Sequence, residues 1–518
     1  MDYANANGHQ TTDDQQALTH QGEFIQTRPD TGSHISELPQ ELLVEVFLIV
    51  QATHGLKNWR NVTYVCRHWR LAALNAAVLW TDPPTHLGKY TCLVLERSKS
   101  ANLHISLGAH TSKATISAVL RHICHIHTMK IYLGIDAMAH AHDILLSCCN
   151  IPWPKLTNLE IDLALSVPTV PSVTLPTINL SPSVIRQLTH LQSLLLAHVT
   201  FDWMALSCPN LTSLVLDNTT LETTISWEQF LGTLDQMPHL ESLSLGLDVI
   251  LQSSHPPLAQ TRCIRLPRLQ YLKLDDLYPY SVSYFLSHSI LPKLNRLIIN
   301  IWWGDGNDDH SGIIQTIFLT LANGDFGLLD SILVAQYHIG LYIQGKVPAV
   351  DVFLPPNGLY DNHNHIHQFI QGLSVITSET SGALAEVRLE LHLNCDELAT
   401  LLGNLPQLKS LVVHHPSVCS PLAQALKSGT LDSSDTTTLF CALEKVSFPT
   451  MQPVYLKSPA MQDFCDSLLA RHRSGFGIKT LQFRKCRTIP HDMMKQLEDI
   501  GICVVDEYES VLQRLASA

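Results

Sequence analysis

Long apolar runs, paired cysteines and an excess of basic residues are all missing from this sequence. The best apolar run, residues 42–50, is broken by Glu45. It falls far short of the ~18 residues that a membrane span needs, so no membrane partner is expected. The 33 basic residues are outnumbered by 46 acidic ones, giving a net charge of −13. This balance argues against nucleic acid as a partner.

The cysteines do not form a recognisable framework. There are 13 of them, scattered along the chain, and no Cys-x-x-Cys pair occurs. Neither a disulfide scaffold nor a zinc module is therefore expected. Residues 1–5 lack the basic and apolar blocks of a secretion signal. Together these features predict a reducing environment, cytoplasmic or nuclear.

Apolar residues, at 45% of the chain, are ample for a folded core. Residues 1–34 differ from the rest: they are rich in Asn, Gln, Thr, Asp and Gly, and contain one basic residue, Arg28. This composition predicts a disordered polar tail.

A small helical domain is expected over residues 35–84. Pro39 suits a first helical turn, and the acidic groups around it favour a helix N-terminus. Two apolar stripes at helical spacing come next. The first consists of Leu42, Leu43, Val46, Phe47 and Val50. The second consists of Val62, Val65, Cys66, Trp69 and Ala73. Asp82-Pro83-Pro84 ends the domain.

Beyond residue 100 a phrase of the form Leu-x-x-Leu-x-Leu recurs twelve times, at irregular steps of 20 to 55 residues. The clearest copies start at Leu156, Leu191, Leu211, Leu240, Leu269 and Leu294. Looser copies start at Ile126, Leu329, Leu384, Leu408, Leu443 and Ile478.

The repeated phrase predicts an α/β architecture for residues 85–518. A proline often stands two residues before a phrase, as Pro209 and Pro238 do, and it ends one element before a short strand begins. Helical spacing at residues 221–234 and 398–405 places helices between the strands. Such units must stack to bury their apolar faces, which predicts an irregular leucine-rich-repeat solenoid, a parallel sheet lined by helices. One or two ordinary α/β domains with leucine-rich strands remain the alternative.

Three N-terminal motifs together resemble an F-box over residues 35–84. They are Leu38-Pro39-x-Glu41-Leu42-Leu43, then Val65-Cys66-Arg67-His68-Trp69-Arg70, then Leu79-Trp80. The segment from Leu95 to Ser100 is similar to the stretch immediately after the F-box in many fungal proteins of this type. The link at residues 48–61 is somewhat long for the family.

The resemblance implies a receptor that docks on a Skp-family adaptor, and through it a cullin, while its C-terminal domain holds a protein substrate for ubiquitin transfer. The adaptor contacts implied are Leu38, Pro39, Leu42, Leu43, Val46, Phe47, Val65, Trp69 and Trp80. For Val65, Trp69 and Trp80, internal packing is the competing role. Two helices with wide apolar faces in about fifty residues would gain from a partner helix.

Substrate contact is expected at the variable positions of the repeated phrases, which alternate with the leucines and face the open side of the sheet. The candidates are Glu160, Asp162, Asp217, Ser244, Tyr271, Lys273, Arg296 and Asn300. A solvated face without a ligand explains each single residue equally well.

No catalytic site, metal site or cofactor is predicted. His363, His365 and His367 alternate as strand ligands would, but a polar loop explains them better. The cluster from His122 to His127 is expected in a buried strand. Phosphate-binding loops, nucleotide fingerprints and hydrolase elbows are absent from the sequence.

The sequence therefore leaves two candidate functions, and an undetected hydrolase is a third that it favours much less. The first is the substrate-recognition subunit of a Skp–cullin–F-box ubiquitin ligase, itself without catalytic activity. The second is a non-degradative repeat scaffold that pairs with an adaptor protein.

Overall fold

A computed structural model describes most of the chain. The residues described are 38–108, 110–132, 153–162, 178–222, 225–247, 263–301, 311–326, 331–335, 338–343, 347–353, 384–403, 405, 407–428, 439–449, 458–483 and 491–506. The expected tail at residues 1–34 and the three alternating histidines at 363–367 lie outside them. No helix in the described ranges is long and apolar enough to cross a membrane.

The chain divides into two compact units. Unit 1 comprises Met1–Asp82 and Leu93–Ala101, and unit 2 comprises Pro83–Cys92 and Asn102–Ala518. The sequence alone assigns residues 93–101 to the larger domain. The difference arises because one helix, α4 (Gly88–Ser98), runs from one unit into the other.

Unit 1 is helical. Besides the end of α4 it contains α2 (Gln40–Asn58), the 3₁₀ helix η2 (Trp59–Tyr64), α3 (Arg67–Asn75) and the 3₁₀ helix η3 (Ala77–Trp80). The expected link at residues 48–61 is thus mostly helix. The expected stripe from Val62 to Ala73 is not one helix, because Cys66 has extended backbone and caps α3 through its sulfur, which accepts from the Trp69 amide.

Unit 2 is built on one large, mostly parallel sheet. Its strands are β1 (Leu103–Gly108), β2 (Ile126–Tyr132), β3 (Asn158–Asp162), β5 (Ser193–Ala197), β7 (Ser213–Leu221), β8 (Ser242–Leu247), β10 (Tyr271–Leu277), β12 (Arg296–Ile301), β13 (Ser331–Ala335), β14 (His338–Ile343), β15 (Val347–Phe353), β16 (Glu386–Glu390), β17 (Ser410–Val413), β18 (Lys445–Phe448), β19 (Thr480–Phe483) and β20 (Cys503–Asp506). Two short strands, β4 (Ile178–Leu180) and β6 (Val199–Phe201), extend it beside β7. A separate pair joins β9 (Ile264–Arg265) to β11 (Ser289–Ile290).

Neighbouring strands follow chain order and are parallel from β1 to β12 and again from β16 to β20. Between these stretches the order is β12, β15, β14, β13, β16, with β14 antiparallel to both neighbours. The insertion falls in the longest step between leucine phrases, and no phrase marks β14 or β15, so the sequence did not predict them.

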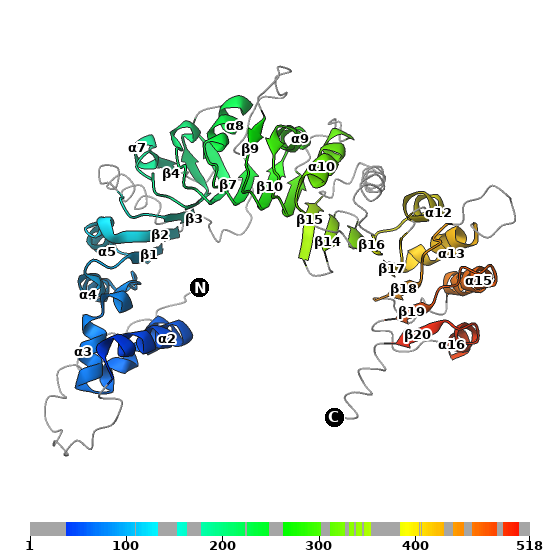
Figure 1. The fold of residues 1–518 in the computed structure, drawn as a ribbon, viewed down its shortest axis with the longest axis horizontal. Helices are drawn as coiled ribbons and strands as arrows, with labels where there is room; N and C mark the ends of the chain where they lie inside the picture. Colours follow the sequence, from blue (N-terminus) through cyan, green and yellow to red (C-terminus); the bar gives the residue numbers. More distant parts are fainter. Residues whose placement is uncertain are drawn as a thin grey trace, which may run out of the picture. The chain divides into compact units, whose positions relative to one another are not determined.

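Helices connect many of the parallel strands. They are α5 (Lys113–Leu120), α7 (Pro182–Ile185), α8 (Trp227–Asp235), α9 (Pro279–Ser287), α10 (Ser311–Asn323), α12 (Cys395–Leu398), α13 (Cys419–Ser428), α15 (Pro459–Arg473) and α16 (His491–Glu498). Short 3₁₀ turns are η4 (Ile123–His125), η6 (Trp203–Ala205) and η8 (Pro416–Val418), and η7 (Ala399–Gly403) is a π-helical turn. In Figure 1, α8, α9 and α10 lie on one side of the strands they connect.

The core lies between this helical layer and the sheet. In β7, Leu214 and Leu216 are buried, while Ser213 and Val215, which alternate with them, point to the other face. All twelve leucine phrases overlap strands, eleven of them beginning two residues before the strand, and the architecture is that of an α/β repeat-like fold.

The two expected helices begin or end differently from the prediction. Helix α8 begins at Trp227 because β7 continues to Leu221, and Ser226 and Gln229 form a capping box that fixes its start. The segment 398–405 holds only the end of α12 and the turn η7.

Candidate docking surfaces

Helix α2 presents two apolar faces. Its backbone begins at Gln40, directly after Pro39, whose carbonyl accepts from the Leu43 amide. Leu43 and Phe47, one helical turn apart, are completely buried. Residues at the same spacing on another side of the helix are instead exposed: Leu42 by 53%, Val46 by 41% and Ile49 by 63%. An amphipathic helix would normally place charged residues there.

The buried face of α2 rests on an aromatic core. The Phe47 and Trp69 rings lie 5.2 Å apart, as do those of Trp59 and Trp80. Trp80 donates from Nε1 to the Ala73 carbonyl at 2.9 Å. These contacts hold α2, α3 and η3 together, so the exposed residues of α2 are presented on a packed support.

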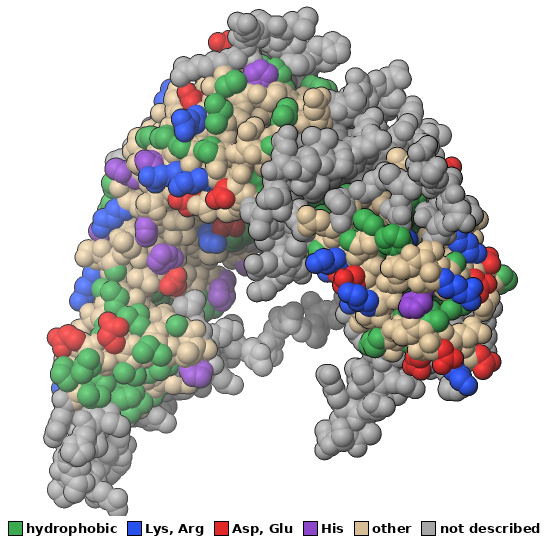
Figure 2. All heavy atoms as spheres, turned by 45° about the vertical axis from the view of Figure 1, so that its right-hand side comes forward, with side chains coloured by type: hydrophobic (Ala, Val, Ile, Leu, Met, Phe, Trp, Pro, Cys, Tyr) green, Lys and Arg blue, Asp and Glu red, His purple; other side chains and the backbone are tan. Residues whose placement is uncertain are grey.

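Exposed apolar side chains continue beyond α2 within unit 1. We give the name apolar face of unit 1 to the exposed large apolar side chains of residues 42–78, which are Leu42, Val46, Ile49, Tyr64, Val65, Leu71 and Val78. Figure 2 shows hydrophobic side chains gathered over this unit. Exposed apolar groups on this scale are typical of interaction sites.

The nine expected adaptor contacts divide by burial. Pro39, Leu42, Val46 and Val65 are exposed, and Leu38 and Trp69 are half-buried. Leu43 and Phe47 are buried, so their prediction as direct contacts is corrected: their side chains pack the core of unit 1. Trp80 is also buried, in agreement with the internal packing role that was its alternative. The Leu38 carbonyl lies 3.3 Å from His68 Nε2, which ties the start of α2 to α3.

Four members of the apolar face were missed by the sequence analysis. For Ile49 a signal existed, since it lies three residues after Val46 and seven after Leu42. For Tyr64, Leu71 and Val78 no signal existed, because their exposure depends on the break at Cys66 and the tight turn of η3.

The open face of the sheet, the second candidate surface, carries charges that largely pair with each other. Glu160 accepts from Lys130 Nζ at 2.7 Å and from the Tyr132 hydroxyl at 2.5 Å, across the parallel pair β2–β3. Burial alone would raise the pKa of Glu160, but these hydrogen bonds lower it below its ordinary value. The hydrogen bond to Glu160 raises the pKa of Lys130.

A similar group lies on β10 and β12. Asp275 accepts hydrogen bonds from Lys273 and from the Asn300 amide. Burial alone would lower the pKa of Lys273, but the hydrogen bond to Asp275 and the attraction of the surrounding acidic groups together raise it. The Arg296 guanidinium lies 5.5 Å from the centre of the Tyr271 ring, its neighbour in register.

Asp217, at the end of the leucine phrase on β7, is exposed and lies over Gly246 of the next strand. A Cβ at Gly246 would come within 2.9 Å of the Asp217 carboxylate, so glycine provides the room for this carboxylate. Asp162 of β3 and Ser244 of β8 are half-buried on the same face.

The eight expected substrate residues therefore do not converge on one point. Lys273 and Asn300 meet through Asp275, Ser244 is the register neighbour of Lys273, and Tyr271 meets Arg296. Asp217 lies on β7 but is near enough to attract Lys273, whereas Glu160 and Asp162 lie on β3. Asp275 was expected on this sheet face, whereas the partners Lys130 and Tyr132 were not among the expected residues. Strand register could have revealed them.

The inserted strands carry a further pair that the sequence did not predict. His338 Nε2 lies 2.8 Å from Asp351 Oδ1, and the His338 ring stacks on Phe353 at 4.4 Å. The Arg388 guanidinium contacts Glu386 at 2.7 Å. Glu386 also accepts a hydrogen bond from the Ser410 hydroxyl of the next strand at 3.2 Å.

Among the described residues, no three His, Cys, Asp or Glu side chains converge as metal ligands would. The cluster from His122 to His127 is not a buried strand throughout: a turn and η4 precede β2, and His127 meets the Thr157 hydroxyl. Burial lowers the pKa of His122 and of His127.

No protein-family model and no curated protein matches this sequence. Among solved structures, the chain is similar to one from the crystal structure of the Rad7 and Elc1 complex in yeast, at 13% identity, covering 72% of this chain and 88% of that one. The TM-score is 0.27, too low to carry an argument about fold or function.

Proposed function

We propose that this protein is the substrate-recognition subunit of a Skp–cullin–F-box ubiquitin ligase. Unit 1 is the F-box, which docks a Skp-family adaptor and, through it, a cullin. Unit 2 is an irregular leucine-rich-repeat solenoid that holds a protein substrate. The chain itself is non-catalytic and acts in the cytoplasm, the nucleus or both.

The observation that carries the proposal is the apolar face of unit 1. Leu42, Val46 and Ile49 stand one turn apart on a helix whose other apolar side is already buried. Burying an aliphatic side chain of this size is worth about 1.5–3 kcal/mol, so leaving three outside is costly without a partner. A helix packed into an apolar groove is the recognition mode that such spacing suits.

The position of this surface relative to the three sequence motifs supports an F-box in particular, and not merely an exposed apolar patch. It follows the Leu38-Pro39 motif directly. Trp69 of the second motif packs against Phe47 of α2, and Trp80 of the third motif packs against Trp59, which follows α2 in the chain. The motifs that gave the resemblance are thus used as the support of the docking helix.

Unit 2 supports a role in holding a protein. Parallel strands in chain order repeat side-chain rows at a spacing of about 4.8 Å, which suits an extended partner surface. Catalysis in the assembly would come from proximity, because a tethered substrate raises the local concentration of its lysines near the ubiquitin carrier.

Co-expression with a Skp-family adaptor tests the proposal. The intact chain should retain the adaptor on purification, and Leu42→Ala with Val46→Ala should weaken retention by about 30-fold or more, at ~2 kcal/mol or more for lost anchors. Met204→Ala, at an equally exposed apolar residue of unit 2, is the matched control and should change nothing. An intact chain that fails to hold the adaptor would remove the proposal.

A second assay separates a degradation receptor from a scaffold. The adaptor complex is mixed with cullin, ubiquitin carrier and co-purified proteins, and ubiquitin transfer is followed. Transfer to a protein bound by unit 2 supports the receptor. Stable adaptor binding with no cullin association would instead identify the scaffold.

A further inference from the structure

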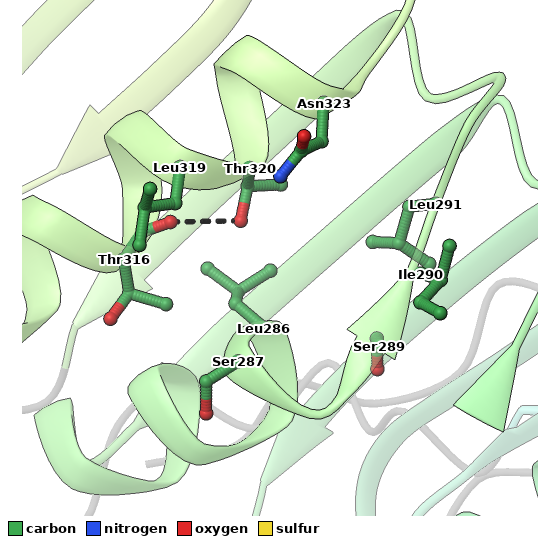
Figure 3. Close-up of a pocket in the computed structure, with 9 residues that line it drawn as sticks. All are labelled: Leu286, Ser287, Ser289, Ile290, Leu291, Thr316, Leu319, Thr320 and Asn323. Carbon is green, nitrogen blue, oxygen red and sulfur yellow. Dashed lines mark hydrogen bonds between the residues drawn. The ribbon is translucent and has the colours of Figure 1, made fainter. Parts of the chain in front are cut away.

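A cavity of about 460 Å³ opens in unit 2 where α9, β11 and α10 meet (Figure 3). Its lining residues come from the end of α9, from β11 and the residue after it, and from one side of α10: Leu286, Ser287, Ser289, Ile290, Leu291, Thr316, Leu319, Thr320 and Asn323. At ~30 Å³ per water molecule, this volume corresponds to about fifteen waters. It falls within the range of roughly 300–1,000 Å³ that is typical of small-molecule sites.

The apolar part of the lining has a buried floor and an exposed rim. Leu286 and Leu291 are buried, whereas Ile290 is 50% and Leu319 58% exposed. Figure 3 shows Leu319 on α10 and Ile290 on β11 at different sides of the opening. An apolar ligand between them would remove these two side chains from water, a gain that the empty cavity lacks.

The hydrogen bonds of the polar lining residues leave Thr320 as an acceptor. Thr320 donates its hydroxyl proton to the Thr316 carbonyl at 2.9 Å, so its oxygen keeps lone pairs for a ligand. Ser287 Oγ lies 3.1 Å from the Tyr284 carbonyl and 3.0 Å from His288 Nδ1, and the buried Ser289 hydroxyl has no hydrogen-bond partner among the described residues. Asn323 is exposed and brings an amide that can donate or accept.

Charge is missing from the lining: no Lys, Arg, His, Asp or Glu is among these nine residues. A ligand charge would lose hydration here without gaining a partner, which is unfavourable. Acids, amines and phosphates are therefore disfavoured.

We propose that this cavity binds an uncharged, largely apolar small molecule that donates one hydrogen bond, from a hydroxyl or N–H group, to Thr320. The site is distinct from both docking surfaces and does not depend on the proposed ligase function. Thr320 is the specificity-determining residue, because its oxygen selects a donor over an apolar group of the same size.

The test uses three probes with one biphenyl body: biphenyl-4-ol, 4-methylbiphenyl and biphenyl-4-carboxylate. Dissociation constants are measured on the full chain by ligand-observed NMR titration. The phenol should bind most tightly, the methyl compound about tenfold more weakly for the loss of one hydrogen bond, and the carboxylate weakest.

Three variants test whether the probes bind in this cavity. Thr320→Val keeps the side-chain shape and removes the acceptor, so the phenol should fall to the affinity of the methyl compound, which itself should not change. Ile290→Ala with Leu319→Ala should weaken both. Met204→Ala, an exposed apolar residue elsewhere in unit 2, should affect neither.

The proposal is overturned if the phenol shows no binding up to its solubility limit, if the carboxylate binds as well as the phenol, or if Thr320→Val leaves the preference for the phenol intact. Because none of these measurements involves the adaptor, the outcome is independent of the ligase assays.

Discussion

Unit 1 and unit 2 use apolar residues in opposite ways. In unit 1 a single helix buries Leu43 and Phe47 and leaves Leu42, Val46 and Ile49 outside. In the described part of unit 2 the leucines of the phrases are buried, and the opposite sheet face carries polar groups that pair with each other. Leucine content is therefore uninformative by itself. The placement of apolar residues outside a core is what points to a partner.

The largest expected effect compares a buried leucine of unit 2 with an exposed one of unit 1. Leu243→Ala removes a completely buried side chain and should lower the free energy of unfolding by about 2–5 kcal/mol. Leu42→Ala should change it by no more than about 0.5 kcal/mol. Urea unfolding followed by tryptophan fluorescence measures both. A large loss for Leu42→Ala would show that Leu42 belongs to a core after all.

A second effect concerns a charge inside unit 2. Arg471 of α15 is completely buried and donates to the carbonyls of Leu439 and Phe440, and its burial lowers the pKa of the guanidinium. Arg471→Ala should cost about 2–4 kcal/mol, because two carbonyls lose their donors. Arg473→Ala, exposed on the same helix, is the control for loss of charge alone. Equal unfolding midpoints for the two variants would contradict this account.

The smallest effect lies on the sheet face. The pKa of Glu160 is lowered on folding, so its contribution is present above the ordinary carboxyl pKa of 4.5 and is lost as the pH falls through the lowered value. Because both partners are partly exposed, Glu160→Gln should cost less than about 1 kcal/mol at pH 7.

Unfolding measured at pH 7 and again below pH 4.5 checks the sign: the difference between Glu160→Gln and the unchanged chain should shrink in acid. Glu241→Gln, at an exposed carboxylate, should show no such trend. A difference that grows in acid would mean that burial, not Lys130 and Tyr132, dominates at this carboxyl.

Much of the sheet could be predicted because its signal is local. Most leucine phrases place two apolar residues on one side of a short strand and a third just before it, and every phrase overlaps a strand, including the looser one at Ile478. Strands without a phrase, such as β14 and β15, were not predicted, because they lack the repeated pattern: β14 pairs with its chain neighbours β13 and β15, and β15 joins β12 from much earlier in the chain.

The candidate surfaces were only partly predictable for a related reason. Periodicity identifies the apolar residues of α2 but not which of its two apolar sides meets the core, and that choice depends on Trp69 arriving from another helix. The burial of Arg471 could not be predicted from the sequence either, because the carbonyls to which it donates lie about thirty residues earlier in the chain.

Hydrogen exchange of the full chain, with and without a saturating Skp-family adaptor, tests the central claim most directly. Binding should slow exchange in the amides of residues 40–50 and 64–78 and leave the strands of unit 2 unchanged. Protection confined to unit 2, or none in α2 while the adaptor is bound, would contradict the assignment of the apolar face of unit 1 as the docking site.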